Sequence, residues 1–133
     1  TSYSLNSDGR IKACASWAGV VNLLDKAQMA IAGAPLVSKT YVGCELNSAN
    51  DTLRYREASP YFMATSTSVP TFFLQGTQDI AVPYSSVMNM QQHLTELGVE
   101  TRMKVFDGGG HLWFGNDLET ARALTIDWFK AKL

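Results

Sequence analysis

One stretch of the sequence, from Pro70 to His111, constrains the fold of this 133-residue chain more than any other. An apolar segment, Thr71 to Gln75, ends at a glycine turn, and a second one, Thr101 to Phe106, ends at a run of three glycines. The segment between them carries apolar residues at helical spacing. Two strands joined by a helix form a βαβ unit, in which the strands are parallel. The stretch therefore predicts a parallel sheet.

The rest of the chain extends this alternation of strands and helices. The apolar run within 11–17 is typical of a strand that is covered on both faces. The expected helices cover 25–32, 36–42, 51–58 and 83–97, and a last helix begins where Asn116 and Glu119 resemble a capping box. Because strands alternate with helices, the sequence predicts an α/β fold, with a parallel sheet of about three strands flanked by helices.

An acid and a histidine follow the two strands of the central unit. Asp79 comes three residues after Gly76, and His111 comes directly after Gly110. The carboxyl ends of parallel strands meet at one rim of the sheet, where ligands and chemistry usually lie. A glycine turn and a surface loop would give the same local patterns. The two residues together favour the acid–base half of a hydrolytic triad, with His111 as general base and then general acid.

The composition excludes several other classes of protein. Apolar residues make up 46% and charged residues 17% of the chain, which is typical of a globular domain. The formal net charge is −1 and no basic run is present, so nucleic acid is not an expected partner. No apolar stretch reaches the roughly 18 residues of a membrane helix. With two histidines and two cysteines in the whole chain, neither a metal site nor a cofactor is expected.

The residues that carry this pattern resemble the end of an α/β-hydrolase. The likeness rests on the segments 76–83 and 108–111, and it is closest to esterases and lipases and to prolyl-oligopeptidase-like peptidases. Three further segments match in the family's order: 10–19 resembles the strand after the nucleophile helix, 55–60 the segment before the acid strand, and 127–129 the closing helix. The resemblance covers nearly the whole chain.

This resemblance implies a fold, an activity and two site residues. The fold is a three-layer sandwich, and residues 1–133 form a single domain that corresponds to the C-terminal portion of an α/β-hydrolase. Asp79 would be the triad acid and His111 the triad base. The activity would be hydrolysis of a small carboxylic ester by acyl transfer to a serine, without a metal or cofactor.

The family's nucleophile has no counterpart in this chain. The family carries its serine in G-x-S-x-G, upstream of the acid and the histidine, and this sequence contains no such motif. Ser16 comes nearest, but Cys14 and Ala18 stand where the motif has glycines. We therefore expect the nucleophile on a missing or separate polypeptide, and this chain alone to be inactive. A homologue that has lost catalysis is the alternative.

The missing half also predicts a partner. The strand within 11–17 would present an apolar open edge, which favours association. We expect the missing N-terminal half, or a second copy of the chain, to cover it.

Three aromatic or titratable residues complete the candidates. Trp17, at the end of its strand, and Trp113, just after His111, are candidates for substrate contact, although packing explains Trp17 equally well and aromatic residues such as Trp113 more often belong to the core. His93 lies off the apolar stripe of its helix, so we expect it to be solvated. A serine peptidase of the prolyl-oligopeptidase type and a non-catalytic α/β binding or assembly module remain the alternative functions.

Overall fold

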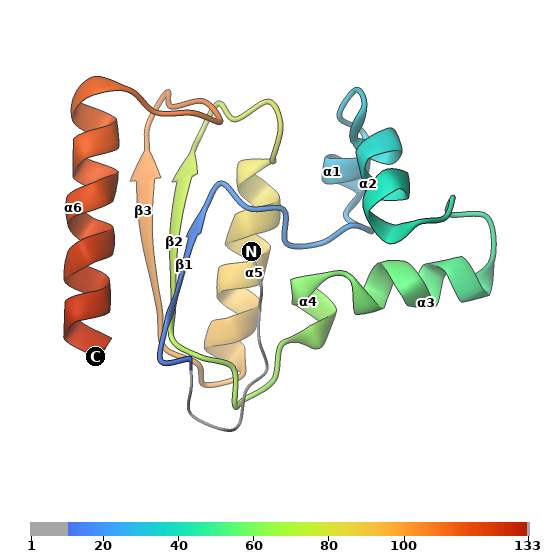
Figure 1. Ribbon diagram of the computed structural model, residues 1–133, viewed down its shortest axis with the longest axis horizontal. Helices are drawn as coiled ribbons and strands as arrows, with labels where there is room; N and C mark the ends of the chain where they lie inside the picture. The colour runs from blue at the N-terminus through green and yellow to red at the C-terminus, as the bar shows by residue number, and fades with distance from the viewer. Residues whose placement is uncertain (1–10, 133) are drawn as a thin grey trace.

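The protein was examined as a computed structural model, which describes residues 11–132. Its elements in chain order are β1 (Cys14–Trp17), α1 (Lys26–Met29), α2 (Ala34–Val42), α3 (Ala49–Glu57), α4 (Pro60–Met63), β2 (Thr71–Gly76), α5 (Tyr84–Glu96), β3 (Thr101–Phe106) and α6 (Gly115–Lys132). The three strands form one parallel sheet in the order β1-β2-β3. Helix α6 covers one face of the sheet and α5 the other, while α1 to α3 lie to one side (Figure 1). The predicted α/β sandwich is confirmed.

The central strand β2 divides the core into two halves. All six residues of β2 are buried. Successive side chains of a strand point to opposite faces, so Phe72 and Leu74 join the core beneath α6 while Phe73 joins the core beneath α5. The stripe of α5 expected from the sequence contributes Val87 and its neighbours to the second half. A strand buried on both faces places its carboxyl end rigidly, and the candidate site lies there.

Helix boundaries follow local signals in the first half of the chain. Asp25 caps α1, because its carboxylate accepts hydrogen bonds from the backbone of Ala27 and Gln28. The break expected at Ser59 and Pro60 ends α3, but Pro60 also opens the short helix α4, which the sequence reading missed. Proline is well suited to the first position of a helix, since the amide hydrogen it lacks would have no partner there.

Some sequence-based expectations were wrong. Helix α6 begins at Gly115, so Asn116 lies inside its first turn, and Glu119 pairs with Arg122 instead of completing a capping box. His93 is not merely solvated: its ring stacks on that of Tyr61, with 4.5 Å between centroids. The stacking partner comes from α4, a helix that the sequence did not indicate.

Two further features concern membrane-spanning helices and the two cysteines. None of the helices between residues 11 and 132 is long and apolar enough to cross a membrane. Cys14 and Cys44 are free thiols. Cys14 is only partly buried, because β1 is the last strand of the described sheet on that side, and this burial raises the pKa of its thiol.

Candidate active site

The carboxyl ends of β2 and β3 meet so closely that only glycine fits at the contact. A Cβ atom on Gly76 would lie 2.2 Å from the carbonyl oxygen of Gly109, well inside van der Waals contact. The loops that follow the strands are tied together, since the backbone N–H of Gln78 donates to that same oxygen at 2.9 Å. Thr77 N–H likewise donates to the carbonyl oxygen of Phe106 at 3.1 Å. The two loops therefore form one rim.

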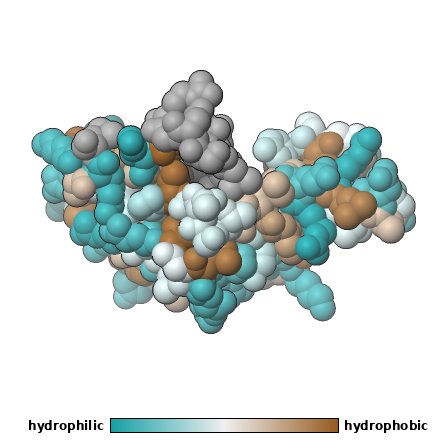
Figure 2. Space-filling model, turned by 90° about the horizontal axis from the view of Figure 1, so that it is seen from below, coloured by the Kyte–Doolittle hydropathy of each residue, from teal (hydrophilic) through white to brown (hydrophobic). Residues whose placement is uncertain are grey.

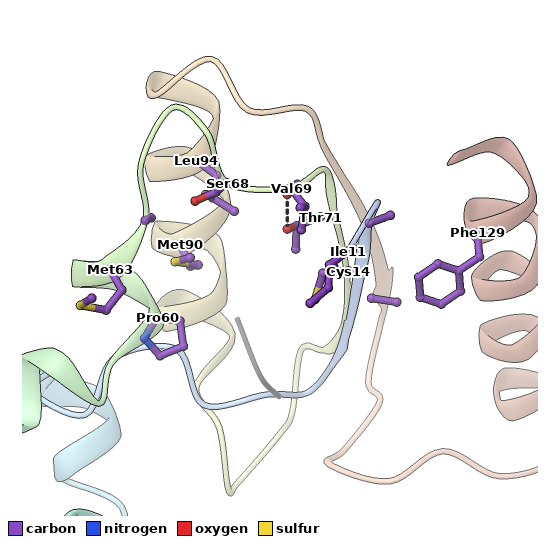
Figure 3. A pocket seen from close by; sticks show the side chains of 13 residues that line it. Ile11, Cys14, Pro60, Met63, Ser68, Val69, Thr71, Met90, Leu94 and Phe129 are labelled. Atoms are coloured by element: carbon purple, nitrogen blue, oxygen red, sulfur yellow. Dashed lines mark hydrogen bonds between the residues drawn. The ribbon is translucent and has the colours of Figure 1, made fainter. Parts of the chain in front are cut away.

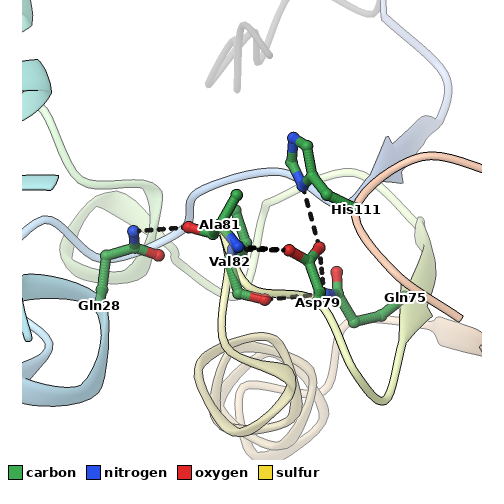
Figure 4. Close-up of polar contacts among 6 residues, drawn as sticks. All are labelled: Gln28, Gln75, Asp79, Ala81, Val82 and His111. Carbon is green, nitrogen blue, oxygen red and sulfur yellow. Dashed lines mark hydrogen bonds and ion pairs between the residues drawn. The ribbon is translucent and has the colours of Figure 1, made fainter. Parts of the chain in front are cut away.

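This rim brings Asp79 and His111 into direct contact. Nδ1 of His111 lies 3.0 Å from Oδ2 of Asp79 (Figure 4). The Asp79 side chain is fully buried, whereas that of His111 is 41% exposed. An ionised carboxylate only accepts hydrogen bonds, so Nδ1 must carry the proton in this pair. Figure 4 shows the other ring nitrogen directed away from Asp79.

The Asp79 carboxylate is held by further donors. Its Oδ1 accepts hydrogen bonds from the backbone N–H groups of Ala81 and Val82, each at 2.8 Å. Its Oδ2 accepts a third from Nε2 of Gln75 at 2.9 Å, beside the bond from His111. Burial alone would raise the pKa of Asp79, but the bonds from Val82, His111 and Ala81 favour the ionised form and keep the pKa below its ordinary value. The acid is therefore ionised and fixed in place.

Asp107, the acid nearest to His111 along the chain, has a different role. Its carboxylate is exposed and accepts from the hydroxyl of Thr77 at 3.3 Å. The same hydroxyl accepts from the backbone N–H of Gly108 at 2.8 Å. Asp107 thus stabilises the loop that carries His111, while Asp79 supplies the carboxylate that faces the imidazole.

The two candidate tryptophans lie against each other. Their ring centroids are 5.7 Å apart, and Trp17 Nε1 donates to the hydroxyl of Thr125 at 2.9 Å. Trp113 is buried and packs on the ring of Phe106, so it belongs to the core. Trp17 is 38% exposed at the carboxyl end of β1. Substrate contact by Trp17 or Trp113 stays a prediction.

Ser16 lies within a strand and not on a turn. It is buried in β1, opposite Phe73 of β2. Its hydroxyl has no hydrogen-bond partner among residues 11–132. A nucleophilic serine of this class stands at a sharp strand-to-helix turn with its oxygen exposed, and Ser16 has neither feature.

Two buried glutamines near the site were not predicted from the sequence. Gln75 is the residue of β2 that contacts Asp79, and Gln28 of α1 donates from Nε2 to the carbonyl oxygen of Ala81 at 3.0 Å. The signal for Gln75 was present, since it is a long polar side chain near the end of an otherwise apolar strand. Nothing in the sequence links Gln28 to a loop 53 residues away. No cluster of three potential metal ligands occurs in the described part of the chain.

A parallel sheet with a buried acid and a histidine at its carboxyl rim is the arrangement found in α/β-hydrolases, a class that includes many serine hydrolases. Residues 3–133 match the prolyl oligopeptidase family, and the chain belongs to that family.

Known proteins of two kinds are similar to the chain. Acylamino-acid-releasing enzyme 1 of Oryza sativa subsp. japonica is 37% identical over 67 residues, which are 50% of this chain and 9% of that enzyme. The Pyrococcus horikoshii acylaminoacyl peptidase superposes with a TM-score of 0.74 at 22% identity, over 98% of this chain and 21% of the other. A Thermogutta terrifontis esterase gives 0.67 at 17% identity, over 90% and 42%. The chain therefore spans less than half the length of each.

Proposed function

We propose that this chain supplies the acid and the histidine of a serine hydrolase site that cleaves carboxylic esters. The observation that carries the proposal is the buried, ionised Asp79 bonded at 3.0 Å to Nδ1 of His111, whose side chain is 41% exposed. Membership of the prolyl oligopeptidase family supports the general class of serine hydrolase.

The geometry suits a cycle in which the proton moves through one nitrogen. His111 Nε2 accepts the proton of the serine hydroxyl as that oxygen bonds to the ester carbonyl carbon. The imidazolium that results is stabilised by the Asp79 carboxylate, which stays ionised throughout. Nε2 then gives the proton to the departing alcohol. In the second half of the cycle, water attacks the acyl group in the same way, which releases the carboxylic acid product and regenerates the serine.

Trp17 is proposed to border the substrate, with Trp113 supporting its ring from the core. Trp17 is partly exposed at the same end of the sheet as His111, and its ring rests against that of Trp113. A flat apolar surface held in this way favours contact with an acyl or alcohol group. Trp113 acts from beneath, since its own side chain is buried.

The serine is proposed to come from a polypeptide segment that covers the outer edge of β1. None of the described residues pairs with that edge. Beside it, at the end of the sheet away from His111, lies an apolar cavity of about 230 Å³ between β1, α4 and α5, lined in part by Ile11, Met63 and Met90 (Figure 3). Hydrophobic residues also reach the surface at this end (Figure 2). An apolar edge of this kind favours strand addition, and a second copy of the chain is the competing occupant.

A peptidase is the second candidate. The relatives include acylamino-acid-releasing enzymes, so an acylated peptide is the alternative substrate class. The acid and the histidine would act in the same way, with an amine in place of the alcohol as leaving group.

The test combines intact mass with turnover. The intact mass of the purified protein is measured under denaturing conditions. The native protein is then assayed on a short-chain aryl ester and on an N-acylated amino-acid anilide. A serine-reactive fluorophosphonate then marks the nucleophile. Ester turnover with the label on a second polypeptide supports the proposal, whereas preference for the anilide favours the peptidase. A single unlabelled and inert polypeptide contradicts both and favours a binding module.

A further inference from the structure

We propose that Gln75 is a positioning residue, which fixes the Asp79 carboxylate for His111. The inference rests on the proposed function for its catalytic consequence, but its structural part concerns the acid–histidine pair alone.

The Gln75 amide spans the whole acid loop. Its Nε2 donates one hydrogen to Oδ2 of Asp79 and the other to the carbonyl oxygen of Val82, both at 2.9 Å. The side chain is completely buried and belongs to β2, the strand with no exposed residue. Two residues of the loop between β2 and α5, Asp79 and Val82, are therefore attached to the most buried strand of the sheet by one side chain (Figure 4).

Gln75 donates to Oδ2 of Asp79, the same oxygen that contacts His111. Oδ1 of Asp79 is held by two backbone N–H groups, which fix its position but leave the carboxylate free to tilt about that point. Oδ2 receives His111, whose side chain is 41% exposed and has its own freedom of movement. Gln75 is the buried donor on Oδ2. Without it, the oxygen that receives the imidazole would be placed by the imidazole alone.

The chemistry of an amide also suits the task. A neutral donor orients the carboxylate without cancelling its charge, which remains available to stabilise the imidazolium. A lysine or arginine would place a competing cation beside His111. Gln75 has a cost, because its Oε1 is buried without a hydrogen-bond partner in the described part of the chain, and an unpaired buried carbonyl is destabilising. A leucine would avoid that cost but would remove both hydrogen bonds that Gln75 donates, so the contributions to positioning and to stability must be separated by experiment.

Gln28 supports the same loop one step further away. It donates to the carbonyl oxygen of Ala81, and that carbonyl belongs to the peptide unit whose N–H, on Val82, donates to Asp79. Hydrogen bonds in such a chain polarise one another. We therefore expect a loss of Gln28 to act in the same direction as a loss of Gln75, and more weakly.

The first test replaces Gln75 with methionine, which has a similar length and no donor. With one donor gone, the pKa of Asp79 should rise, as measured by NMR of its carboxyl carbon. The NMR signal of the hydrogen-bonded Nδ1 proton of His111 should become weaker or disappear. In the hydrolytically active protein, kcat should fall about tenfold or more, which corresponds to the loss of one hydrogen bond to a charged group. KM should change little.

A matched control separates positioning from stability. Ser59 is also completely buried and makes two hydrogen bonds, to Leu23 N–H and to the carbonyl oxygen of Tyr55, both remote from the acid loop. Ser59→Ala should lower the midpoint of unfolding but leave the Asp79 pKa, the His111 proton and kcat unchanged. If Gln75→Met behaves like Ser59→Ala in all these readouts, the proposal is overturned.

A second variant keeps the test decisive if the methionine variant does not fold. In Gln75→Glu, a protonated glutamic acid still donates to Asp79, and the neighbouring carboxylate raises its pKa. The pair should persist at neutral pH and fail in alkali, when the glutamate ionises. A loss that is equal at every pH contradicts positioning. The NMR readouts need no turnover, so an inert sample with a shifted Asp79 upholds this inference while contradicting the proposed function.

Discussion

The rim formed by the carboxyl ends of β2 and β3 differs from β1 in how many of its polar groups have hydrogen-bond partners. At the rim, the two oxygens of Asp79 receive four donors, and the loops are tied by backbone hydrogen bonds. In β1, the buried hydroxyl of Ser16 has no partner among the described residues, and Cys14 is half-covered. The chain forms the acid–histidine half of a site by itself. None of the described residues pairs with the outer edge of β1, and we propose that another segment covers it.

The largest expected effect is the loss of turnover when His111 is replaced. In a preparation that hydrolyses the aryl ester, His111→Ala should reduce kcat by roughly a thousandfold or more, because the proton then has no acceptor. The free energy of unfolding should fall only modestly, because His111 is 41% exposed and Asp79 keeps three other donors. His93→Ala is the control, as it removes the other histidine of the chain. Turnover that survives in the His111 variant would assign the base elsewhere.

The next effect disrupts the contact between the two loops. Gly76→Ala forces a Cβ to within 2.2 Å of the Gly109 carbonyl oxygen, so the backbones must separate. We expect a loss of about 3 kcal/mol in the free energy of unfolding, measured by urea titration. Gly110→Ala, where an added Cβ meets nothing within 4 Å, should cost less than about 0.5 kcal/mol. Equal losses would mean that the rim is looser than the structure shows.

The third effect is the pH dependence that Asp79 gives to stability. Because its pKa is lowered in the folded protein, the ionised carboxylate contributes stability above its unfolded pKa of about 4, and this contribution is lost as the pH falls through the folded value. The difference in unfolding free energy between the wild type and Asp79→Asn should therefore be full at pH 7 and shrink in acid. A difference that stays constant down to about pH 3 would show that the carboxylate charge is not stabilised.

The smallest effect compares two buried serines. Ser59→Ala should cost roughly 1–3 kcal/mol, since it leaves a buried N–H group without its partner. Ser16→Ala should stay within about 0.5 kcal/mol, because its hydroxyl makes no bond within residues 11–132. Both are measured by thermal and urea unfolding. A clear loss for Ser16→Ala would mean that its hydroxyl has a hydrogen-bond partner outside residues 11–132.

The same contrast explains what could be predicted from the sequence. The contact between Asp79 and His111 could be predicted because each follows an apolar strand and a glycine turn, and because parallel strands end at one rim. The alternation of β2, α5 and β3 was readable for the same reason. These signals are local or follow from simple topology.

The features that were missed depend on distant contacts. Gln28 acts on a carbonyl 53 residues away, and the ring of His93 depends on where Tyr61 of α4 comes to lie. The start of α6 was set two residues too late, at Asp117 instead of Gly115, since Asn116 is a good cap by type but lies within the helix. Side-chain partners of this kind are chosen by the tertiary fold, and local sequence preferences do not encode them.

The most direct test of the central claim is ¹⁵N NMR of the His111 ring at a pH where the ring is neutral. With His93→Gln, His111 is the one histidine that remains, so its signals need no further assignment. The account predicts the tautomer with the proton on Nδ1, bonded to Asp79, and a free Nε2, and it predicts that Asp79→Asn abolishes this preference. A proton on Nε2 in the unaltered pair would contradict the account, because His111 could then not receive a proton from a serine.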